Sequence, residues 1–225
     1  MEKTFSKIYD KNIWGNGSGL GSTLNYNKAY IDFLTEFMNE LNIKKVLDIG
    51  CGDWQFSQYI DWSNKHYMGI DCVQSVIHNN NLKFKKNNIE FHQIDPTISE
   101  DFDLIPKKCD LVILKDILQH WDNNNIVKFM DKLTNEGGHK LILVVNNFKN
   151  ADGVGRSINN RYHYAKLDAS QFPLNKYSPQ ILGYYKFKQV AIIDTNRLEN
   201  VIQNGSNKKS RKSLKKNKKY SRNNY

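Results

Sequence analysis

Side chains able to bind or react recur just after the short apolar runs of this 225-residue chain. Carboxylates at such positions can hydrogen-bond the hydroxyl and amino groups of a ligand, and an imidazole can accept a proton near neutral pH. Glycines there let the backbone turn tightly and approach a ligand without a Cβ in the way. The candidates, in chain order, are Asp48, Gly50, Gly52, Asp71, Asp95, Lys115, Asp116 and His120.

These residues need a framework that brings the ends of several strands together. Short apolar runs alternate with helix-length segments, and the runs lack the period-two alternation of half-exposed strands, which is typical of a parallel sheet covered by helices on both faces. A helix is predicted over 25–41, where apolar residues recur at helical spacing. The sequence therefore predicts an α/β, Rossmann-like fold, with ligands bound at the carboxyl ends of the strands. The predicted strands are 45–49, 66–71, 89–94, 111–114, 141–145 and 189–194.

The turn that begins at Asp48 is compatible with more than one nucleotide ligand. Asp71 lies 21 residues beyond Gly50, near the spacing of about 20 residues at which an acid can bind the ribose of an adenosyl group. Gln55 stands where a dinucleotide fingerprint has its third glycine, which permits close approach of a pyrophosphate. S-adenosylmethionine has no phosphate, so the turn favours this donor over a nicotinamide dinucleotide.

Four segments resemble the successive motifs of class I S-adenosylmethionine-dependent methyltransferases, and the resemblance covers about residues 42–146. The leader at 12–22, together with the Cys-Gly-Asp-aromatic turn, more narrowly resembles a little-characterised subgroup whose look suggests sugar or glycan modification. Trp54 departs from the usual small residue of the turn, and Asn146-Asn147 departs from the expected hydroxyl residues after the fifth strand. The four segments are VLDIGCGD (46–53), YMGID (67–71), FHQID (91–95) and DLVILKDILQH (110–120).

The resemblance assigns roles to individual residues of the donor site. It implies that Gly50 and Gly52 pack against S-adenosylmethionine, that Asp71 binds its ribose and that Asp95 lies beside its adenine. Lys115 is placed in the same site by its position after the fourth predicted strand. No cysteine pair has the close spacing of a metal site, and no metal is expected.

Methyl transfer is an in-line displacement that needs a general base only when the acceptor is a weak acid such as a hydroxyl. His120 is the first candidate for this base, because a helix starting at Asp116 would place His120 at i+4 on the same face, where the carboxylate could orient the imidazole. The alternative is that His120 only packs inside a helix. Asp48 either contacts the donor or accepts backbone amides of its own turn. Trp14 either covers the sulfonium by a cation–π contact or anchors the leader on the core.

The chain divides into a glycine-rich flap (1–22), a methyltransferase domain (23–204) and a basic tail (205–225). The segment 147–165 lacks periodicity and is predicted to form a substrate lid. The tail holds nine of the 33 basic residues and no acid, so the net charge of +10 comes almost entirely from this end. We expect the tail to be disordered, either a solvated extension or a ligand for a polyanion such as RNA, an acidic protein or a membrane surface.

Three functions are compatible with these features. The first is O-methylation of a sugar, a glycan or another small hydroxylated acceptor; the second is methylation of RNA or protein held by the tail; the third is a catalytically silent donor-binding subunit. No Asn/Asp-Pro-Pro-aromatic motif follows the fourth strand, which argues against methylation of adenine in DNA. The three cysteines lie in or beside apolar runs, and no apolar stretch approaches the length of about 18 residues that a membrane span requires, so we expect a cytoplasmic protein without a transmembrane segment.

Overall fold

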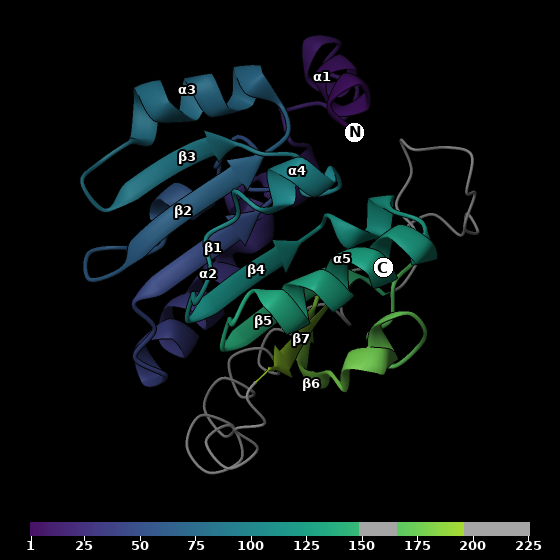
Figure 1. Cartoon of the computed structure of the whole chain (residues 1–225). Coiled ribbons are helices and arrows are strands. Elements are labelled where there is room, and N and C mark those ends of the chain that lie inside the picture. The colour runs from purple at the N-terminus through teal and green to yellow at the C-terminus, as the bar shows by residue number, and fades with distance from the viewer. Residues whose placement is uncertain (149–165, 196–225) are drawn as a thin grey trace, which may run out of the picture.

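The computed structural model describes residues 1–148 and 166–195, which form a central sheet between two layers of helices (Figure 1). In this part of the chain no helix is long and apolar enough to cross a membrane. The strands are β1 (Lys45–Ile49), β2 (His66–Asp71), β3 (Ile89–Gln93), β4 (Leu111–Lys115), β5 (Leu141–Asn147), β6 (Gln180–Tyr185) and β7 (Lys188–Asp194). The α-helices are α1 (Glu2–Asp10), α2 (Leu24–Glu40), α3 (Gln74–Phe84), α4 (Ser99–Phe102) and α5 (Asn123–Glu136).

The sheet is mostly parallel, as the sequence predicts. Its seven strands in the described residues have the order β3-β2-β1-β4-β5-β7-β6, and the first five strands of the chain pair in parallel. Strand β7 runs antiparallel to β5, and β6 pairs with β7 as a hairpin at the sheet edge. Strand β6 was not predicted, because Gly183, together with Gln180, Tyr184 and Tyr185, weakens the apolar pattern there. The order reverses between β1 and β4, which is the place where open α/β sheets bind ligands.

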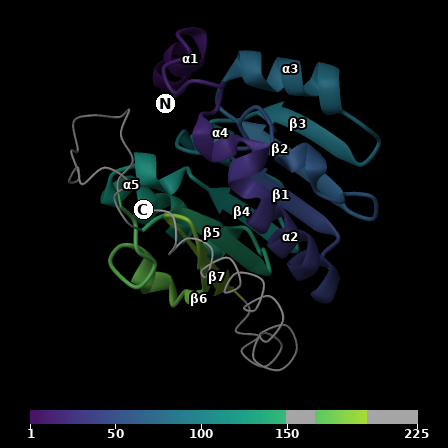
Figure 2. The same cartoon turned by 180° about the vertical axis from the view of Figure 1, so that it is seen from behind.

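Two apolar clusters, one on each face of the sheet, explain why the central strands β1, β4, β5 and β7 are almost entirely buried, whereas the edge strands β3 and β6 are only partly so. On one face α2 packs with its Tyr30, Phe33 and Phe37, and this helix lies in front of the sheet in Figure 2. On the other face α5 contributes Phe129 and Leu133, and its first turn is capped by the Asp122 side chain, which accepts a hydrogen bond from the Asn125 amide. The fold class predicted from the sequence is confirmed.

The leader contains more regular structure than a glycine-rich flap suggests. Its first residues form α1, which lies beyond the carboxyl ends of the strands (Figure 1). The glycine-rich part that follows takes left-handed backbone angles at Gly15, Gly17 and Gly19, and a short 3₁₀ turn, η1 (Leu20–Ser22), leads into α2. The predicted lid at 147–165 lies outside the described residues from position 149, and the basic tail lies wholly outside them.

Candidate active site

A cleft opens at the carboxyl ends of β1, β2 and β4, with the leader forming its other wall. Its volume of about 280 Å³ is close to the lower end of the range of about 300–1,000 Å³ for small-molecule sites. Every one of the eight positions singled out after the strands, and Trp14 as well, lines this cleft. The structure therefore brings the predicted site residues together. The wall also includes residues that the sequence did not single out, namely Met1, Phe5, Tyr9, Ser18, Leu20, Gly21, Ser22, Tyr26, Cys51, Phe56, Cys72, Pro96, Ile117, Trp121, Asn147, Phe187 and Lys188.

The glycine turn after β1 is held between two other loops. Gly50 has a φ of 73° and Gly52 a φ of 57°, a region that favours glycine. A Cβ on Gly50 would lie 2.2 Å from the Ile117 side chain of the loop after β4, and a Cβ on Gly52 would lie 2.6 Å from Ser18 Oγ of the leader. Both glycines are therefore required for the close packing of three segments around the cleft.

Asp48 has a different partner from the one the turn suggests. Its carboxylate accepts a 2.7 Å hydrogen bond from the Tyr67 hydroxyl of the neighbouring strand β2, and no backbone amide of the turn is among its hydrogen-bond partners in the described residues. Burial raises the pKa of Asp48 to about 6, against the lowering effects of Tyr67 and Lys115. Asp48 lines the cleft, and its contact with a donor stays a prediction.

Asp71 is the residue that holds the glycine turn. Its carboxylate accepts hydrogen bonds from the Gly52 amide at 3.1 Å and from the Val73 amide at 3.0 Å. Burial raises the pKa of Asp71, and these backbone hydrogen bonds oppose the shift. Positioned this way, Asp71 connects the ends of β1 and β2 and faces the cleft, where its role toward a ribose stays a prediction.

Asp95 lies at the end of the cleft beyond β3. Its carboxylate pairs with the Met1 ammonium at 2.9 Å and accepts two hydrogen bonds from Thr97. Burial raises the pKa of this carboxyl, but the hydrogen bonds of Thr97 and the Met1 ammonium outweigh it and hold the pKa below its usual value. Asp95 is thus a fixed negative charge at the place expected for an adenine.

The leader is attached to the glycine turn by a reciprocal pair of hydrogen bonds, here called the leader clasp. The Ser18 amide donates to the Asp53 carboxylate at 3.0 Å, and the Asp53 amide donates to Ser18 Oγ at 3.0 Å. Tyr9 of α1 shares a 2.5 Å hydrogen bond with the same hydroxyl. The leader and the Cys-Gly-Asp-aromatic turn, which are separate motifs in the sequence, therefore form one structural unit.

Trp14 and His120 are in direct contact across the cleft wall. Their rings stack at 5.4 Å with an interplanar angle of 27°, and the Phe5 ring stands edge-on to both. Burial lowers the pKa of His120 to about 4, against the raising effect of the Asp116 charge and of a hydrogen bond with the Asp116 backbone. The imidazole is therefore neutral at physiological pH and available as a proton acceptor.

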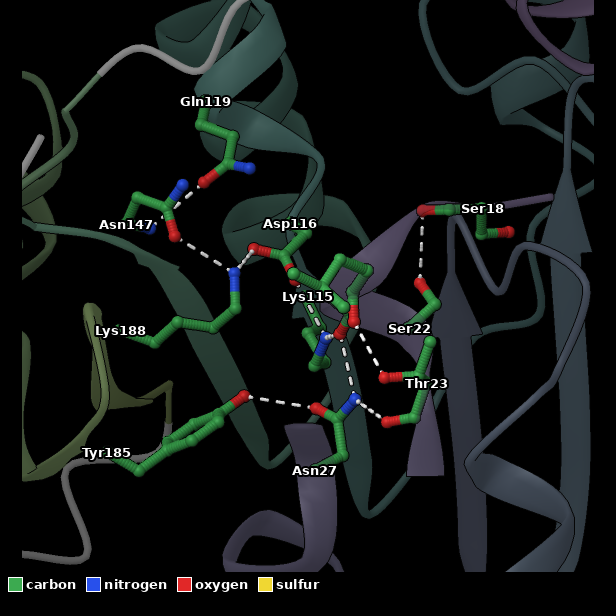
Figure 3. A network of polar contacts seen from close by, with 12 residues as sticks. Ser18, Ser22, Thr23, Asn27, Lys115, Asp116, Gln119, Asn147, Tyr185 and Lys188 are labelled. Carbon is green, nitrogen blue, oxygen red and sulfur yellow. Dashed lines mark hydrogen bonds and ion pairs between the residues drawn. The ribbon is translucent and has the colours of Figure 1, made fainter. Parts of the chain in front are cut away.

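The expected geometry of Asp116 and His120 is wrong in one respect. Asp116 does not begin a helix, because its φ is 63°, and only a 3₁₀ turn, η3 (Leu118–His120), follows. The Asp116 carboxylate points away from an i+4 partner and binds two ammonium groups, Lys115 at 2.7 Å and Lys188 at 2.5 Å (Figure 3). Burial raises its pKa, but the two lysines dominate and lower it to about 2. His120 therefore contacts Asp116 through a hydrogen bond with the Asp116 backbone.

Lys188 is the principal residue that the sequence did not indicate, and it lies beside Asn147, which the sequence marked only as a departure from the expected hydroxyl residues. Lys188 Nζ donates to Asn147 Oδ1 at 2.9 Å, and the Asn147 amide is bound by Gln119 Oε1 at 2.9 Å (Figure 3). Lys188 is the first residue of β7 and is buried in the structure, and because its burial cannot be read from the sequence, no local signal marked it. Its partner Asp116 is 72 residues away in the sequence.

Trp54, the departure from the usual turn, faces away from the cleft. It has a φ of 57° and is 4% exposed, and its ring packs against Tyr67, Phe84 and Phe91 in the core. The large side chain therefore leaves the cleft unobstructed.

With this geometry established, comparisons with known proteins identify the domain. Residues 46–138 match a family model described as a methyltransferase domain. Over 126 residues the chain is 27% identical to a ubiquinone biosynthesis O-methyltransferase of Proteus mirabilis (strain HI4320), which covers 56% of this chain and 51% of that protein. A protein of the same name from Rickettsia akari (strain Hartford) is 25% identical over 158 residues, 67% of this chain and 61% of that one. The chain thus spans about half to under two thirds of the length of these curated relatives.

A solved structure with the same fold is the N-methyltransferase NodS from Bradyrhizobium japonicum WM9 in complex with S-adenosyl-L-homocysteine. It superposes with a TM-score of 0.63 at 12% identity and covers 86% of this chain and 99% of that one. At this identity the likeness concerns the fold.

Proposed function

Because the chain carries a class I S-adenosylmethionine-dependent methyltransferase domain, we propose that the protein transfers the methyl group of this donor to a hydroxyl group of a sugar, a glycan or another small hydroxylated acceptor. The observation that carries the proposal is the neutral His120 imidazole in the wall of a cleft whose other end is lined by three carboxylates. The imidazole is proposed as the proton acceptor, and the carboxylates as the site for the positively charged donor.

The residues present fit S-adenosylmethionine. The turn at Gly50 and Gly52 has no Cβ toward the cleft, and Asp71 faces the cleft from the end of β2. Trp14 Nε1 is buried in the wall with no hydrogen-bond partner among the described residues, so it can donate to a ligand. When bound, the donor supplies an electrophilic methyl group on a sulfonium. In this proposal Asp48 would bind the methionine ammonium, Asp71 the ribose hydroxyls and Asp95 the adenine amino group.

Within this cleft, the chain's own contribution is to orient the acceptor and to take its proton. His120 is held by ring stacking on Trp14 and by the Asp116 backbone, so the orientation of its imidazole is fixed relative to the glycine turn. Because its pKa lies well below neutral, the imidazole is unprotonated and can accept the proton that the hydroxyl loses as the new C–O bond forms. The aromatic rings of Phe5 and Trp14 exclude water from the imidazole.

Oxygen is favoured as the acceptor atom for two reasons. A hydroxyl needs the assistance of a base, whereas a free amine does not, and the curated relatives are named as O-methyltransferases. The resemblance of the leader and turn favours a sugar or glycan among hydroxylated acceptors. The free thiols of Cys51, Cys72 and Cys109 agree with a reducing compartment, so the proposed setting is the cytoplasm.

The proposal is tested by replacing His120 in an assay of S-adenosylhomocysteine formation over a panel of sugars, glycans and phenols. His120→Ala is expected to lower kcat about a hundredfold or more, while affinity for S-adenosylhomocysteine stays within about twofold. The wild-type rate should fall only as the pH drops toward 4, where the imidazole is protonated. His78→Ala, an exposed position on α3, is the matched control. Undiminished turnover of every acceptor by His120→Ala contradicts the assignment.

The basic tail supports a second candidate, methylation of an RNA or protein acceptor held electrostatically. The nine cations of 205–225 have no acid among them, and such a segment binds polyanions in a salt-dependent manner. Deleting 205–225 should then raise KM steeply at low salt only. An unchanged KM excludes this candidate, and any turnover by the isolated chain excludes a catalytically silent subunit.

A further inference from the structure

The two halves of the cleft carry opposite charge. Around the glycine turn, the donor half presents the carboxylates of Asp48 and Asp71, and that of Asp95 paired with the Met1 ammonium, so its net negative charge suits a donor with a sulfonium and an ammonium group. The other half, between β4, β5 and β7, is here called the acceptor half. It presents two ammonium groups, Lys115 and Lys188, and a different carboxylate (Figure 3).

In the acceptor half, one carboxylate serves both cations. Asp116 Oδ2 binds Lys115 Nζ at 2.7 Å and Asp116 Oδ1 binds Lys188 Nζ at 2.5 Å. The other partners of the ammonium groups are neutral: the Gly21 carbonyl for Lys115 at 3.2 Å and Asn147 Oδ1 for Lys188 at 2.9 Å. The three ions therefore leave one positive charge without a hydrogen-bonded counterion among the described residues.

The surroundings make this excess charge costly. Lys188 is only 3% exposed and Lys115 only 8%, and the rings of Phe56 and Tyr26 lie 4.8 Å and 5.8 Å from the two ammonium groups. Burial and the neighbouring Lys115 charge both lower the pKa of Lys188, with burial the larger cause. A buried cation of this kind is stabilised strongly by an anion that reaches it.

Asp48 lies within electrostatic reach of Lys115 but makes no hydrogen bond to either ammonium group among the described residues. Its carboxylate is hydrogen-bonded to Tyr67 on the far side of β1, and it is Asp116 that contacts both lysines. Each ammonium has three donors, and two on each are accounted for by the oxygens named above. Within residues 1–148 and 166–195, one donor on Lys188 thus remains for a ligand in the cleft.

We propose that the acceptor half binds an ionised acid group of the methyl acceptor through Lys188, so that the preferred acceptors are hydroxy acids. This inference rests on the proposed function and narrows it: among sugars the class is the uronic acids, and among phenols the hydroxybenzoic acids. The acid group anchors the acceptor beside Asn147, and its hydroxyl then faces His120 and the donor half.

The carboxylate of the donor itself is the other source of an anion. The two lysines differ in their neighbours. Lys115 lies by Phe56 and within electrostatic reach of Asp48 at the start of the glycine turn, whereas Lys188 lies with Asn147 and Phe187 at the hairpin of β6 and β7. The experiment separates the two sources by measuring the donor product and the acceptor analogues independently.

The test is calorimetric titration of the full chain saturated with S-adenosylhomocysteine, using two pairs of molecules that differ only in charge. The pairs are 3,4-dihydroxybenzoate with 3,4-dihydroxybenzamide, and glucuronate with glucuronamide. We expect an acid of at least one pair to bind about tenfold or more tightly than its amide. In Lys188→Met this preference should disappear, while binding of S-adenosylhomocysteine is unchanged.

Two further variants keep the test informative. Asp116→Asn removes the one carboxylate of the described part of the chain that is hydrogen-bonded to both lysines, and should widen the preference for the acid, the opposite of Lys188→Met. Lys140→Gln removes an exposed lysine paired with Asp110 at the other end of β5 and should change nothing.

Three results overturn the proposal: no difference between acid and amide in either pair, a difference that persists in Lys188→Met, or an equal loss of S-adenosylhomocysteine affinity in that variant, which would assign Lys188 to the donor.

Because binding is measured without turnover, the hydroxy-acid proposal and the proposed methyl transfer fail separately. Equal methylation of acid and amide would uphold the methyltransferase while overturning the hydroxy-acid preference. Selective binding of the acid without methyl transfer to any acceptor would uphold the preference for an acid group and overturn the proposed methyl transfer.

Discussion

The donor half and the acceptor half of the cleft are built on different principles. The donor half consists of short motifs at the ends of adjacent parallel strands, in which Asp48, Gly50, Gly52 and Asp71 follow from local sequence. In the acceptor half, an ion cluster joins β4 to a strand far along the chain. Under the two proposals above, methyl-donor binding would depend on backbone geometry, and acceptor choice on a few side chains that are distant in the sequence.

The largest effect on the donor half is expected from Asp71→Ala. It removes the acceptor of the Gly52 and Val73 amides and so loosens the turn itself. Loss of a buried charged acceptor costs about 1.5–3 kcal/mol, so affinity for S-adenosylmethionine should fall roughly ten- to a hundredfold. Calorimetry of wild type and variant measures this, with nicotinamide dinucleotide as the ligand that should not bind.

The matched control for this change is Asp61→Ala, an exposed acid in the loop before β2. If Asp71→Ala bound the donor as tightly as the wild type, the donor half would not depend on the turn geometry. Binding of the dinucleotide alone would contradict the choice of donor.

A smaller effect, the release of a proton when the donor binds, distinguishes the donor half of the cleft from the acceptor half. The pKa of Asp48 is about 6 in the free protein because of burial, and a donor ammonium beside the carboxylate should lower it. Donor binding near pH 6 should therefore release a fraction of a proton, seen as a dependence of binding enthalpy on the ionisation enthalpy of the buffer. Asp48→Asn should abolish the release, and Asp116→Asn should not, because the pKa of Asp116 is already about 2.

The same shift predicts a pH dependence of stability. The folded pKa of Asp48 exceeds its ordinary value of 3.8, so the native state binds the proton more tightly, and the contribution of this group falls as the pH rises from about 4 to about 6. Asp48→Asn should flatten the stability profile across that window. A profile that is the same in both proteins would place the pKa of Asp48 near its ordinary value.

The smallest expected effect concerns the leader clasp. Ser18→Ala removes the hydroxyl that accepts from the Asp53 amide and contacts Tyr9. A single hydrogen bond contributes about 0.5–1.5 kcal/mol, so S-adenosylhomocysteine should dissociate roughly two- to tenfold faster, measured by stopped-flow fluorescence. Ser63→Ala, in an exposed turn, is the control. Unchanged release would show that the leader does not limit product departure.

Much of the fold was predictable because its signals are local. Strands buried on both faces have continuous apolar runs, and all six predicted strands are present, from β1 at Lys45–Ile49 to β7 at Lys188–Asp194. Helix α1 was not predicted, since the glycine-rich segment that follows it dominates the leader. Its burial in the structure comes from tertiary contacts, such as that of Tyr9 with Ser18.

The candidate site was predictable to the extent that strand order determines it. All residues expected after strands line one cleft, because parallel strands end at the same edge. The helix expected at Asp116 was wrong because two lysines and a left-handed φ fix this residue, and neither Lys188 nor its pairing with Asp116 leaves a trace in local sequence. Tyr67 as the partner of Asp48 is likewise a contact between strands.

The position of Lys188 depends on how β7 is aligned in the sheet. It stands opposite Asn147 in the antiparallel pairing with β5 and opposite Tyr185 in the hairpin, where Lys186 takes a φ of 49°. Side chains alternate between the faces of a strand, so a shift of one residue would carry the ammonium to the other face of the sheet. Inserting or deleting a residue in the hairpin would therefore change acceptor recognition and leave the glycine turn untouched. Acceptor specificity in this scaffold can evolve by the length of one turn as readily as by substitution of a side chain.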